Sequence, residues 1–415
     1  MNAVSAIGAA VPIPSLAGVP VEFILFALTL AGVALFHHHT LRVAVIGLVV
    51  IAAYKLAFSV FRGVPGLDGM VALLGHEWVT LANLFGLLLG FALLSKHFEE
   101  SRLPELLPRY LPDDWKGGFA MLVLVFVLSS FLDNIAAAMI GGTMATALFK
   151  GRLHVGFMAA IVAASNAGGS GSVVGDTTTT MMWIAGVKPV QVLEAYTAAV
   201  PALLFFGVIA ARQQHALQPI TKDAPVGITL DAWRLVIVAA ILAAAIASNV
   251  WFNLRHPEVL QSVPVIGIAV WVAIVLTGWI RRPDWSLLPA ATRGSVFLLS
   301  LVLCAAMMPV EHLPAASWPV ALGLGFISAV FDNIPLTALA LHQGGYDWGF
   351  LAYAVGFGGS MIWFGSSAGV ALASMFPQAR SVGAWVTAGW HVAVGYVIGF
   401  VCLLLALGWH PDLPH

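Results

Sequence analysis

Two Asp-Asn pairs inside long apolar runs are the first candidates for chemistry in this sequence. Asp133 is followed by Asn134, and Asp332 by Asn333, in runs that hold no other Asp, Glu, Lys or Arg. A carboxylate in an apolar run is costly enough to indicate function by default. Carboxylate and amide oxygens, with unpaired carbonyls at a helix end, suit a small hard cation such as Na⁺. The structural alternative is that each Asp only caps a following helix.

A third candidate is the polar segment 165–180, which interrupts another apolar run. Its glycines permit unwound backbone, Asn166 supplies a neutral oxygen, and Asp176 stands where a second half-helix would restart. Helix capping alone would explain Asp176 and Thr177. In a similar segment later in the chain, the corresponding position is Ser366, which does not titrate. We therefore expect two ion-binding positions that are not equivalent, one titratable and one neutral.

Two enzyme classes use side chains of the same kinds. Gly365-Ser366-Ser367-Ala368-Gly369, followed by His391, matches the G-x-S-x-G motif of serine hydrolases, but the strand and helix expected around that motif are missing. Asp133 with Asp332 would suit an intramembrane aspartyl protease, although opposed hairpin tips serve a transport path at least as well. We expect a protein that is not an enzyme and has no resident cofactor.

The composition places these residues in a membrane. Of 415 residues, 60% are hydrophobic and 9% are charged, against roughly 25% charged in an ordinary soluble domain. At about 20 apolar residues per crossing, the chain has room for roughly ten to thirteen membrane segments. A net charge of -1 gives no basic field for nucleic acid. The sequence therefore predicts an all-α polytopic membrane protein whose partner is the lipid bilayer.

Hydropathy predicts ten crossings and two re-entrant hairpins. The runs 117–149 and 314–345 carry the Asp-Asn pairs at their middles, and the first would be about 50 Å long as one helix, too long for one crossing. We predict that both turn back at these pairs. The runs 154–187 and 349–376 are interrupted by Gly, Ser and Thr, which predicts crossings with unwound centres. The simple spans fall near 21–36, 41–61, 79–95, 190–211, 232–250, 264–280, 294–311 and 383–409.

The two halves of the chain resemble each other. Asp133-Asn134 recurs 199 positions later as Asp332-Asn333, and Gly175 in the first unwound centre matches Gly365 at an offset of 190. Each half has three spans, a hairpin, a broken crossing and a final span. Five crossings is an odd number, so the second half must be inverted, which is the plan of many secondary transporters. The predicted inverted repeats are 1–212 and 213–415.

The basic residues predict the orientation in the membrane. Threading the segments from an outer N-terminus places most Lys and Arg on the inner side, which these residues prefer. Only Arg62, Lys188 and Arg255 fall outside, and Lys55 falls within a span. We therefore expect both termini outside and a multi-pass location in the bacterial inner (plasma) membrane.

Several motifs together resemble the NhaD-type sodium/proton antiporters of the ion transporter superfamily. The resemblance covers about three-quarters of the chain, from about His97 to the C-terminus. The motifs are Phe131-Leu132-Asp133-Asn134, Asn166-Ala167-Gly168-Gly169, Gly175-Asp176-Thr177-Thr178-Thr179-Thr180-Met181-Met182-Trp183, and Asp332-Asn333-Ile334-Pro335 with Gly358-Gly359-Ser360.

The resemblance implies an activity and a set of ion-site residues. The activity is electrogenic export of cytoplasmic Na⁺ or Li⁺ in exchange for external H⁺, by a homodimer with an inward and an outward hairpin that moves in an elevator-like step. The implied ion-site residues are Asp133, Asn134, Asn166, Asp176, Thr177, Asp332 and Asn333.

A second transport function stays open within the same superfamily. Sodium-coupled dicarboxylate carriers, whose hairpin tips look like Ser-Asn-Thr, carry an anion together with Na⁺. This sequence has Asp at both tips, which would repel a dianion unless cations are bound. The mechanism we expect is competition, in which Asp133, Asp176 and Asp332 bind either Na⁺ or protons, so that coupling follows from shared ligands.

Overall fold

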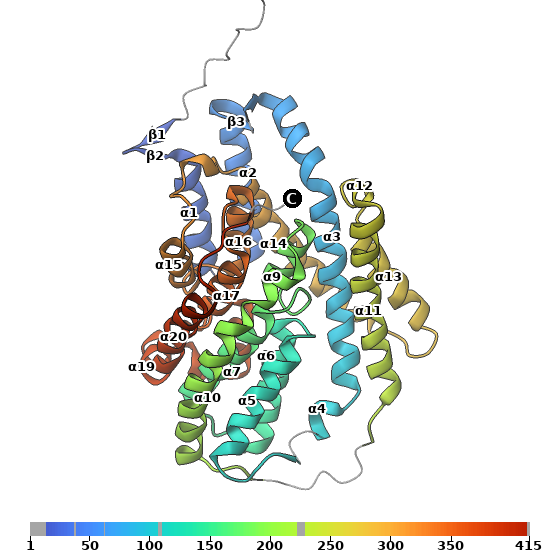
Figure 1. The fold of residues 1–415 in the computed structure, drawn as a ribbon, viewed down its shortest axis with the longest axis vertical. Coiled ribbons are helices and arrows are strands. Elements are labelled where there is room, and N and C mark those ends of the chain that lie inside the picture. The colour runs from blue at the N-terminus through green and yellow to red at the C-terminus, as the bar shows by residue number, and fades with distance from the viewer. Residues whose placement is uncertain (1–13, 37–38, 62, 107–109, 222–228, 413–415) are drawn as a thin grey trace, which may run out of the picture.

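The protein is built almost entirely of helices in the computed structural model, which describes residues 14–36, 39–61, 63–106, 110–221 and 229–412 (Figure 1). Six helices in these ranges are long and apolar enough to cross a membrane, and shorter apolar helices accompany them. The chain is therefore a polytopic membrane protein. Short strands form two small antiparallel ribbons that the sequence did not predict: β1 (Ser15–Leu16) with β2 (Val19–Pro20), and β3 (Val60–Phe61) with β4 (Val64–Pro65).

One layer of the fold combines the leading helices of both halves of the chain. Helix α2 packs against α14, and α3 packs against α11, α13 and α14. Figure 1 shows α3 along the long axis of the molecule, with α11 and α13 beside it. We call this the first layer. Its helices are α1 (Val21–Leu35), α2 (Thr40–Phe58), α3 (Gly66–Glu100), α11 (Ala232–Arg255), α13 (Val265–Thr277) and α14 (Leu288–Ala306), with the short α4 (Leu103–Leu106) and α12 (Pro257–Leu260) attached.

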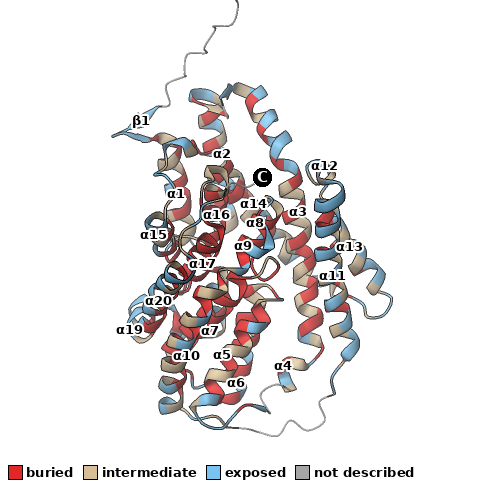
Figure 2. Cartoon of the chain, viewed as in Figure 1, coloured by how far each residue is buried: buried red, intermediate tan, exposed pale blue. Residues whose placement is uncertain are grey.

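The second layer contains the segments that carry the candidate residues. Helices α7 and α17 are buried along almost their whole length, which explains why they are apolar on every face (Figure 2). Helices α10 and α20 pack against each other. The layer consists of α5 (Trp115–Ser129), α6 (Asn134–Leu148), α7 (Val155–Ser170), α8 (Thr177–Ile184), α9 (Pro189–Leu193), α10 (Tyr196–Leu217), α15 (Trp318–Ser328), α16 (Asn333–Gln343), α17 (Trp348–Gly358), α18 (Ser367–Met375), α19 (Val382–Ala388) and α20 (Trp390–Leu407).

Each Asp-Asn pair stands at the start of a helix. Asp133 is the N-cap residue of α6, and Asp332 is the N-cap residue of α16. The chain turns between α5 and α6, which pack against each other. In Figure 1, α6 lies in the lower half of the molecule and α16 in the upper half. The two Asp-Asn pairs therefore approach the centre from opposite ends.

Both predicted broken runs contain a break between two helices. The first break separates α7 from α8, and the second separates α17 from α18. A Cβ atom at Gly175 would overlap the carbonyl oxygen of Ser129, and one at Gly365 would overlap that of Ala329. In both halves the break therefore touches the backbone at the preceding turn, at a contact that only glycine permits.

Three expectations differ from the structure or fall outside it. Helix α3 begins at Gly66, earlier than the predicted 79, because the polar Glu77 is buried within the helix and does not end it. The predicted span 383–409 is two helices separated at Gly389, where a Cβ atom would lie 2.9 Å from Ala159 of α7. The predicted outer position of the termini concerns residues 1–13 and 413–415, which lie outside the described ranges.

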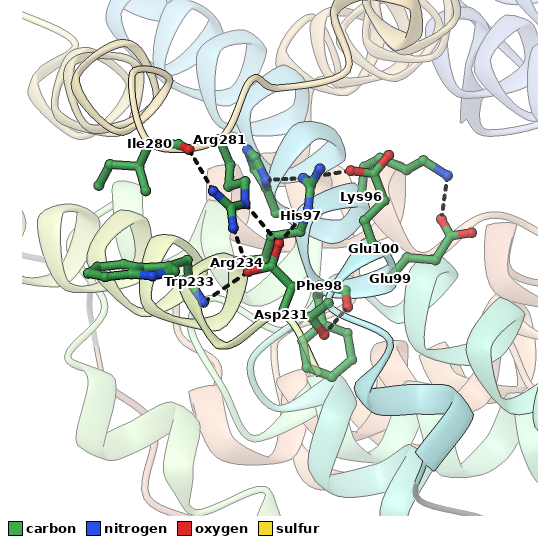
Figure 3. Close-up of polar contacts among 11 residues, drawn as sticks. Lys96, His97, Phe98, Glu99, Glu100, Asp231, Trp233, Arg234, Ile280 and Arg281 are labelled. Carbon is green, nitrogen blue, oxygen red and sulfur yellow. Dashed lines mark hydrogen bonds and ion pairs between the residues drawn. The ribbon is translucent and has the colours of Figure 1, made fainter. Parts of the chain in front are cut away.

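A polar network joins the ends of three first-layer helices (Figure 3). The Arg234 guanidinium lies 2.5 Å from a carboxylate oxygen of Glu100 and 2.9 Å from Nδ1 of His97. Asp231 accepts a hydrogen bond of 2.8 Å from Nε of Arg281. This hydrogen bond holds the pKa of the Asp231 carboxyl below its usual value. The network ties α3 to the start of α11 and to the segment after α13.

Candidate ion-binding site

The carboxylate of Asp176 lies where both halves of the chain meet. Its Oδ1 accepts a hydrogen bond from Nδ2 of Asn134 at 3.2 Å, and its Oδ2 accepts one from Nδ2 of Asn333 at 3.4 Å. The Asp176 side chain is nearly inaccessible, with 3% exposure for the residue. One buried carboxylate therefore bridges the two Asp-Asn pairs, which are far apart in sequence.

Local structure explains why Asp176 occupies this position. It is the N-cap of α8, and its backbone is extended, with φ of -144° and ψ of 146°. The hydroxyl of Thr178 donates to Oδ2 of Asp176 at 2.6 Å. The backbone N–H of Thr178 donates to Oδ1 of Asp176 at 3.5 Å, which is ordinary helix capping. Capping does not require the two asparagine contacts, however, because those amides come from α6 and α16.

Asn166 of α7 extends the network into the second break. Its Oδ1 accepts a hydrogen bond of 3.2 Å from Asn134. Its Nδ2 donates to the hydroxyl oxygens of Ser360 at 2.9 Å and Ser366 at 3.0 Å. Ser366 is in turn the N-cap of α18 and accepts a hydrogen bond from the backbone N–H of Gly369. A fully buried amide in α7 thus links the start of α6 to the second unwound segment through neutral groups.

Asp133 and Asp332 flank this network at the two turns. Asp332 accepts a hydrogen bond of 3.0 Å from the backbone N–H of Ile334 and one of 3.3 Å from the hydroxyl of Ser367. Asp133 lines the cavity that also borders Asp176. The two acids are therefore helix N-caps on opposite sides of the central carboxylate.

The cavity at this point has a volume of about 310 Å³ and separates the two layers. On the second-layer side it is bordered by the first residues of four helices, which are Asn134 of α6, Thr177 of α8, Asn333 of α16 and Ser367 of α18. At about 30 Å³ per water molecule, it has room for a cation and several waters. The first-layer side is formed by α3 and α14, including Leu88, Phe91, Ser95, Ala291, Gly294 and Ser295.

The net charge of the site comes from four helix N-termini and from the carboxylates that cap three of them. Each helix N-terminus carries roughly half a positive charge, so four contribute about two. Three of the four N-cap residues are Asp133, Asp176 and Asp332, and the fourth is Ser366. With all three carboxylates ionised, the sum is about one negative charge. A site of this charge favours one monovalent cation or one proton.

The eight residues proposed from the sequence all lie in this region. Asn134, Asn166, Asp176, Asn333 and Ser366 form one hydrogen-bonded network. Within the described ranges, His, Cys, Asp and Glu side chains form no group of three that could hold a metal ion. An ion bound in this conformation would therefore rely on Asp176 and on neutral amide, hydroxyl and carbonyl oxygens, and not on all three acids together.

Sequence reasoning did not propose Thr178, Ser360 or Ser367 as site residues. Thr178 and Ser360 contact the network, and Ser367 contacts Asp332 beside it. Thr178 had one usable signal, because the residue two positions after an N-cap commonly contacts the cap. The two serines stand among many small polar residues, and only the backbone path of the second break decides which hydroxyls point inward.

The residues weighed for serine hydrolysis are separated in the structure. The hydroxyl of Ser366 contacts Asn166 and Gly369. His391 on α20 makes its contact with Gln213 of α10, at 3.1 Å. These contacts do not form the nucleophile and base pair that a serine hydrolase needs.

Two plant proteins are similar to most of this chain. Sodium/proton antiporter 1 of Arabidopsis thaliana is 25% identical over 345 residues, which is 72% of this chain and 56% of the plant protein. Sodium/proton antiporter 2 of the same plant is 27% identical over 326 residues, which is 68% of this chain and 74% of that protein. No protein-family model matches the chain. The chain spans little more than half of the first relative, and it is a distant homologue of proteins named as sodium/proton antiporters.

Proposed function

We propose that the protein is a secondary active transporter that exports cytoplasmic Na⁺ or Li⁺ in exchange for protons. The observation that carries the proposal is the buried Asp176 carboxylate, held between Asn134 and Asn333 from the two halves of the chain. The names of the two distant plant relatives support the same activity.

The exchange follows from competition for one carboxylate. A buried carboxylate without a counter-ion is strongly disfavoured, so Asp176 is neutralised either by an alkali cation or by a proton. Asp133 and Asp332 add negative charge at the turns, and the four helix starts offset most of it. Binding of one cation type lowers the affinity for the other, which couples their movement in opposite directions.

The proposed architecture is two inverted repeats, residues 1–212 and 213–415, each with a re-entrant hairpin and a broken crossing. Support comes from the opposed placement of α6 and α16 in Figure 1 and from the matching glycine contacts of Gly175 and Gly365. The pairing of α10 with α20, the final helices of the two halves, is consistent with the same plan.

We further propose that the second layer carries the ion across the membrane against the first layer. All the polar ligands of the network belong to the second layer, and the cavity lies between the layers. The lower end in Figure 1 would face the cytoplasm of a bacterial inner membrane, because Lys96, Lys116 and Arg281 lie near helix ends there. The cavity borders α3 near Ser95, so this conformation would open inward. A homodimer is proposed from the family resemblance alone.

Sodium-coupled anion symport is the second candidate. The observation that favours it is the convergence of four helix N-termini, which attract anions. Three of these helices are capped by Asp, however, so an anion would meet three carboxylates unless cations were already bound. Antiport therefore accounts for the site better.

The test uses purified protein in proteoliposomes with a pH-sensitive dye inside. We expect added Na⁺ or Li⁺ to move protons, and Asp176→Asn, Asp133→Asn and Asp332→Asn each to abolish this response. The control is Asp347→Asn, because Asp347 is also a buried helix N-cap but lies at α17, away from the network. Undiminished proton movement in the Asp176 variant would contradict the proposal. Na⁺-stimulated uptake of a labelled dicarboxylate without proton movement would favour the symporter.

A further inference from the structure

A second polar cavity lies at the other end of α16 from the central site. It has a volume of about 330 Å³ and is bordered by α1, α2, α3, α14 and α16. Its charged residues are Glu22, Lys55 and Glu311, and His342 also borders it. Asn333 at the start of α16 lies in the central site, and His342 lies about 14 Å further along the helix axis. The cavity is therefore on the side of the central site opposite to Ser95.

Glu22 provides an unsatisfied carboxylate oxygen in this cavity. It lies in the first turn of α1 and is completely buried. Its Oε1 accepts a hydrogen bond of 2.5 Å from the hydroxyl of Ser59. Its Oε2 is buried without a hydrogen-bond partner among the described residues. An ionised carboxylate left in this way is costly, so a ligand that supplies positive charge is expected at Oε2.

Lys55 supplies a buried positive charge in the same cavity. The residue is 4% exposed, and its Nζ donates a hydrogen bond of 2.6 Å to the backbone carbonyl of Met307. Met307 is the C-cap of α14, and α16 ends at the same cavity. Carbonyl groups at helix C-termini attract cations. The Lys55 ammonium therefore donates to the Met307 carbonyl and not to Oε2 of Glu22, which has no hydrogen-bond partner among the described residues.

We propose that this second cavity binds one alkali cation, with Oε2 of Glu22 as its charged ligand and Lys55 as a built-in competitor. Glu22 and Lys55 are buried, whereas Glu311 is exposed to solvent. Together the two carboxylates and one ammonium leave one negative charge, which matches a monovalent ion. A cation that leaves the central site toward this end of α16 would pass the cavity, so the site is an antechamber on the transport path. The identity of the cation rests on the proposed function, whereas the existence of the site does not.

The test counts sodium sites on the purified full-length protein in detergent, with radiolabelled Na⁺ as the probe. We expect two sites per chain in the wild type, one in Glu22→Gln, one in Asp176→Asn and none in the double variant. Glu258→Gln is the matched control, because Glu258 is a solvent-exposed acid on α12 and should leave both sites intact. Size-exclusion chromatography establishes that each variant is folded.

The outcomes separate this inference from the proposed function. Two sites in Glu22→Gln would overturn the second site, whereas two sites in Asp176→Asn would contradict the central one. If Glu22→Gln does not fold, the double variant Lys55→Met with Asp176→Asn tests the second site instead, through the Na⁺ affinity of the one site that remains. Removing the competing ammonium should tighten the remaining site about tenfold, since a nearby unit charge is lost. An unchanged affinity in that variant would overturn the inference.

Discussion

Replacement of Asn333 by alanine tests whether the second half of the chain holds the central carboxylate of the first. The Asn333 amide donates to Asp176 over 3.4 Å, which is a long hydrogen bond, and both residues are buried. Hydrogen bonds to charged groups contribute about 1.5–3 kcal/mol, and the long distance places this one near the lower limit. A loss of about 1.4 kcal/mol corresponds to a tenfold change in an equilibrium constant.

Because this hydrogen bond orients Asp176 for the ion, we expect Asn333→Ala to raise the Na⁺ concentration for half-maximal exchange by up to about tenfold, with little change in the maximal rate. The assay is Na⁺-driven proton movement in proteoliposomes over a range of Na⁺ concentrations. Asn249→Ala is the matched control, since Asn249 is also a buried asparagine in an apolar helix, but among the described residues the hydrogen bond to its side chain comes from Asn253 of the same helix. Equal shifts in the two variants, or a loss of maximal rate alone, would refute the reasoning.

Three further predictions concern packing, pH and charge. Gly175→Ala should destabilise the protein by about 1–3 kcal/mol, because the new Cβ atom would overlap the backbone of Ser129. Gly75→Ala is the control and should not destabilise it, because no atom lies within 4 Å of the new Cβ position. Thermal unfolding of the two variants measures the difference. Because Arg281 lowers the pKa of Asp231 in the folded state, their pairing stabilises the protein above the ordinary carboxyl pKa of about 3.9. This stabilisation is lost as the pH falls through the lowered pKa, so Arg281→Gln should flatten the acid limb of a plot of melting temperature against pH. Ser366→Asp should raise the number of cations bound at the central site, as measured by labelled Na⁺, and an unchanged number would contradict the charge balance given above.

The elements around the site could be predicted because charge inside an apolar run has few explanations. Asp133 and Asp332 interrupt long apolar segments, and the structure starts a helix at each of them. The glycines of segment 165–180 predicted a break between two helices, and the structure has one at 171–176, whereas 165–170 remain helical in α7. Helix ends were less predictable, because α3 begins at Gly66, well before the predicted 79, and buries the polar Glu77 within the helix.

The contacts between distant segments could not be predicted from the sequence. Asn166 reaches Ser360 and Ser366 only because α7 packs against α17 and α18, the helices on either side of the second break. Likewise, Glu22 and Lys55 border one cavity because α1 and α2 pack beside α14, and no local pattern relates those positions. Periodicity and polarity report on single segments, whereas these contacts depend on tertiary packing.

In the proposed transporter, helix capping and ion binding would be two effects of the same residues, and not alternative explanations. A helix N-terminus stabilises an adjacent carboxylate, which makes three buried acids tolerable in an apolar environment. The same four N-termini would repel a cation if no acid were present. The three carboxylates of Asp133, Asp176 and Asp332 carry about one more negative charge than the four N-termini carry positive charge. A fourth carboxylate in place of Ser366 would raise this negative excess to about two. Under the proposed function, the asymmetry between Asp176 and Ser366 would limit the central site to one monovalent ion or one proton at a time, which is the condition for strict exchange.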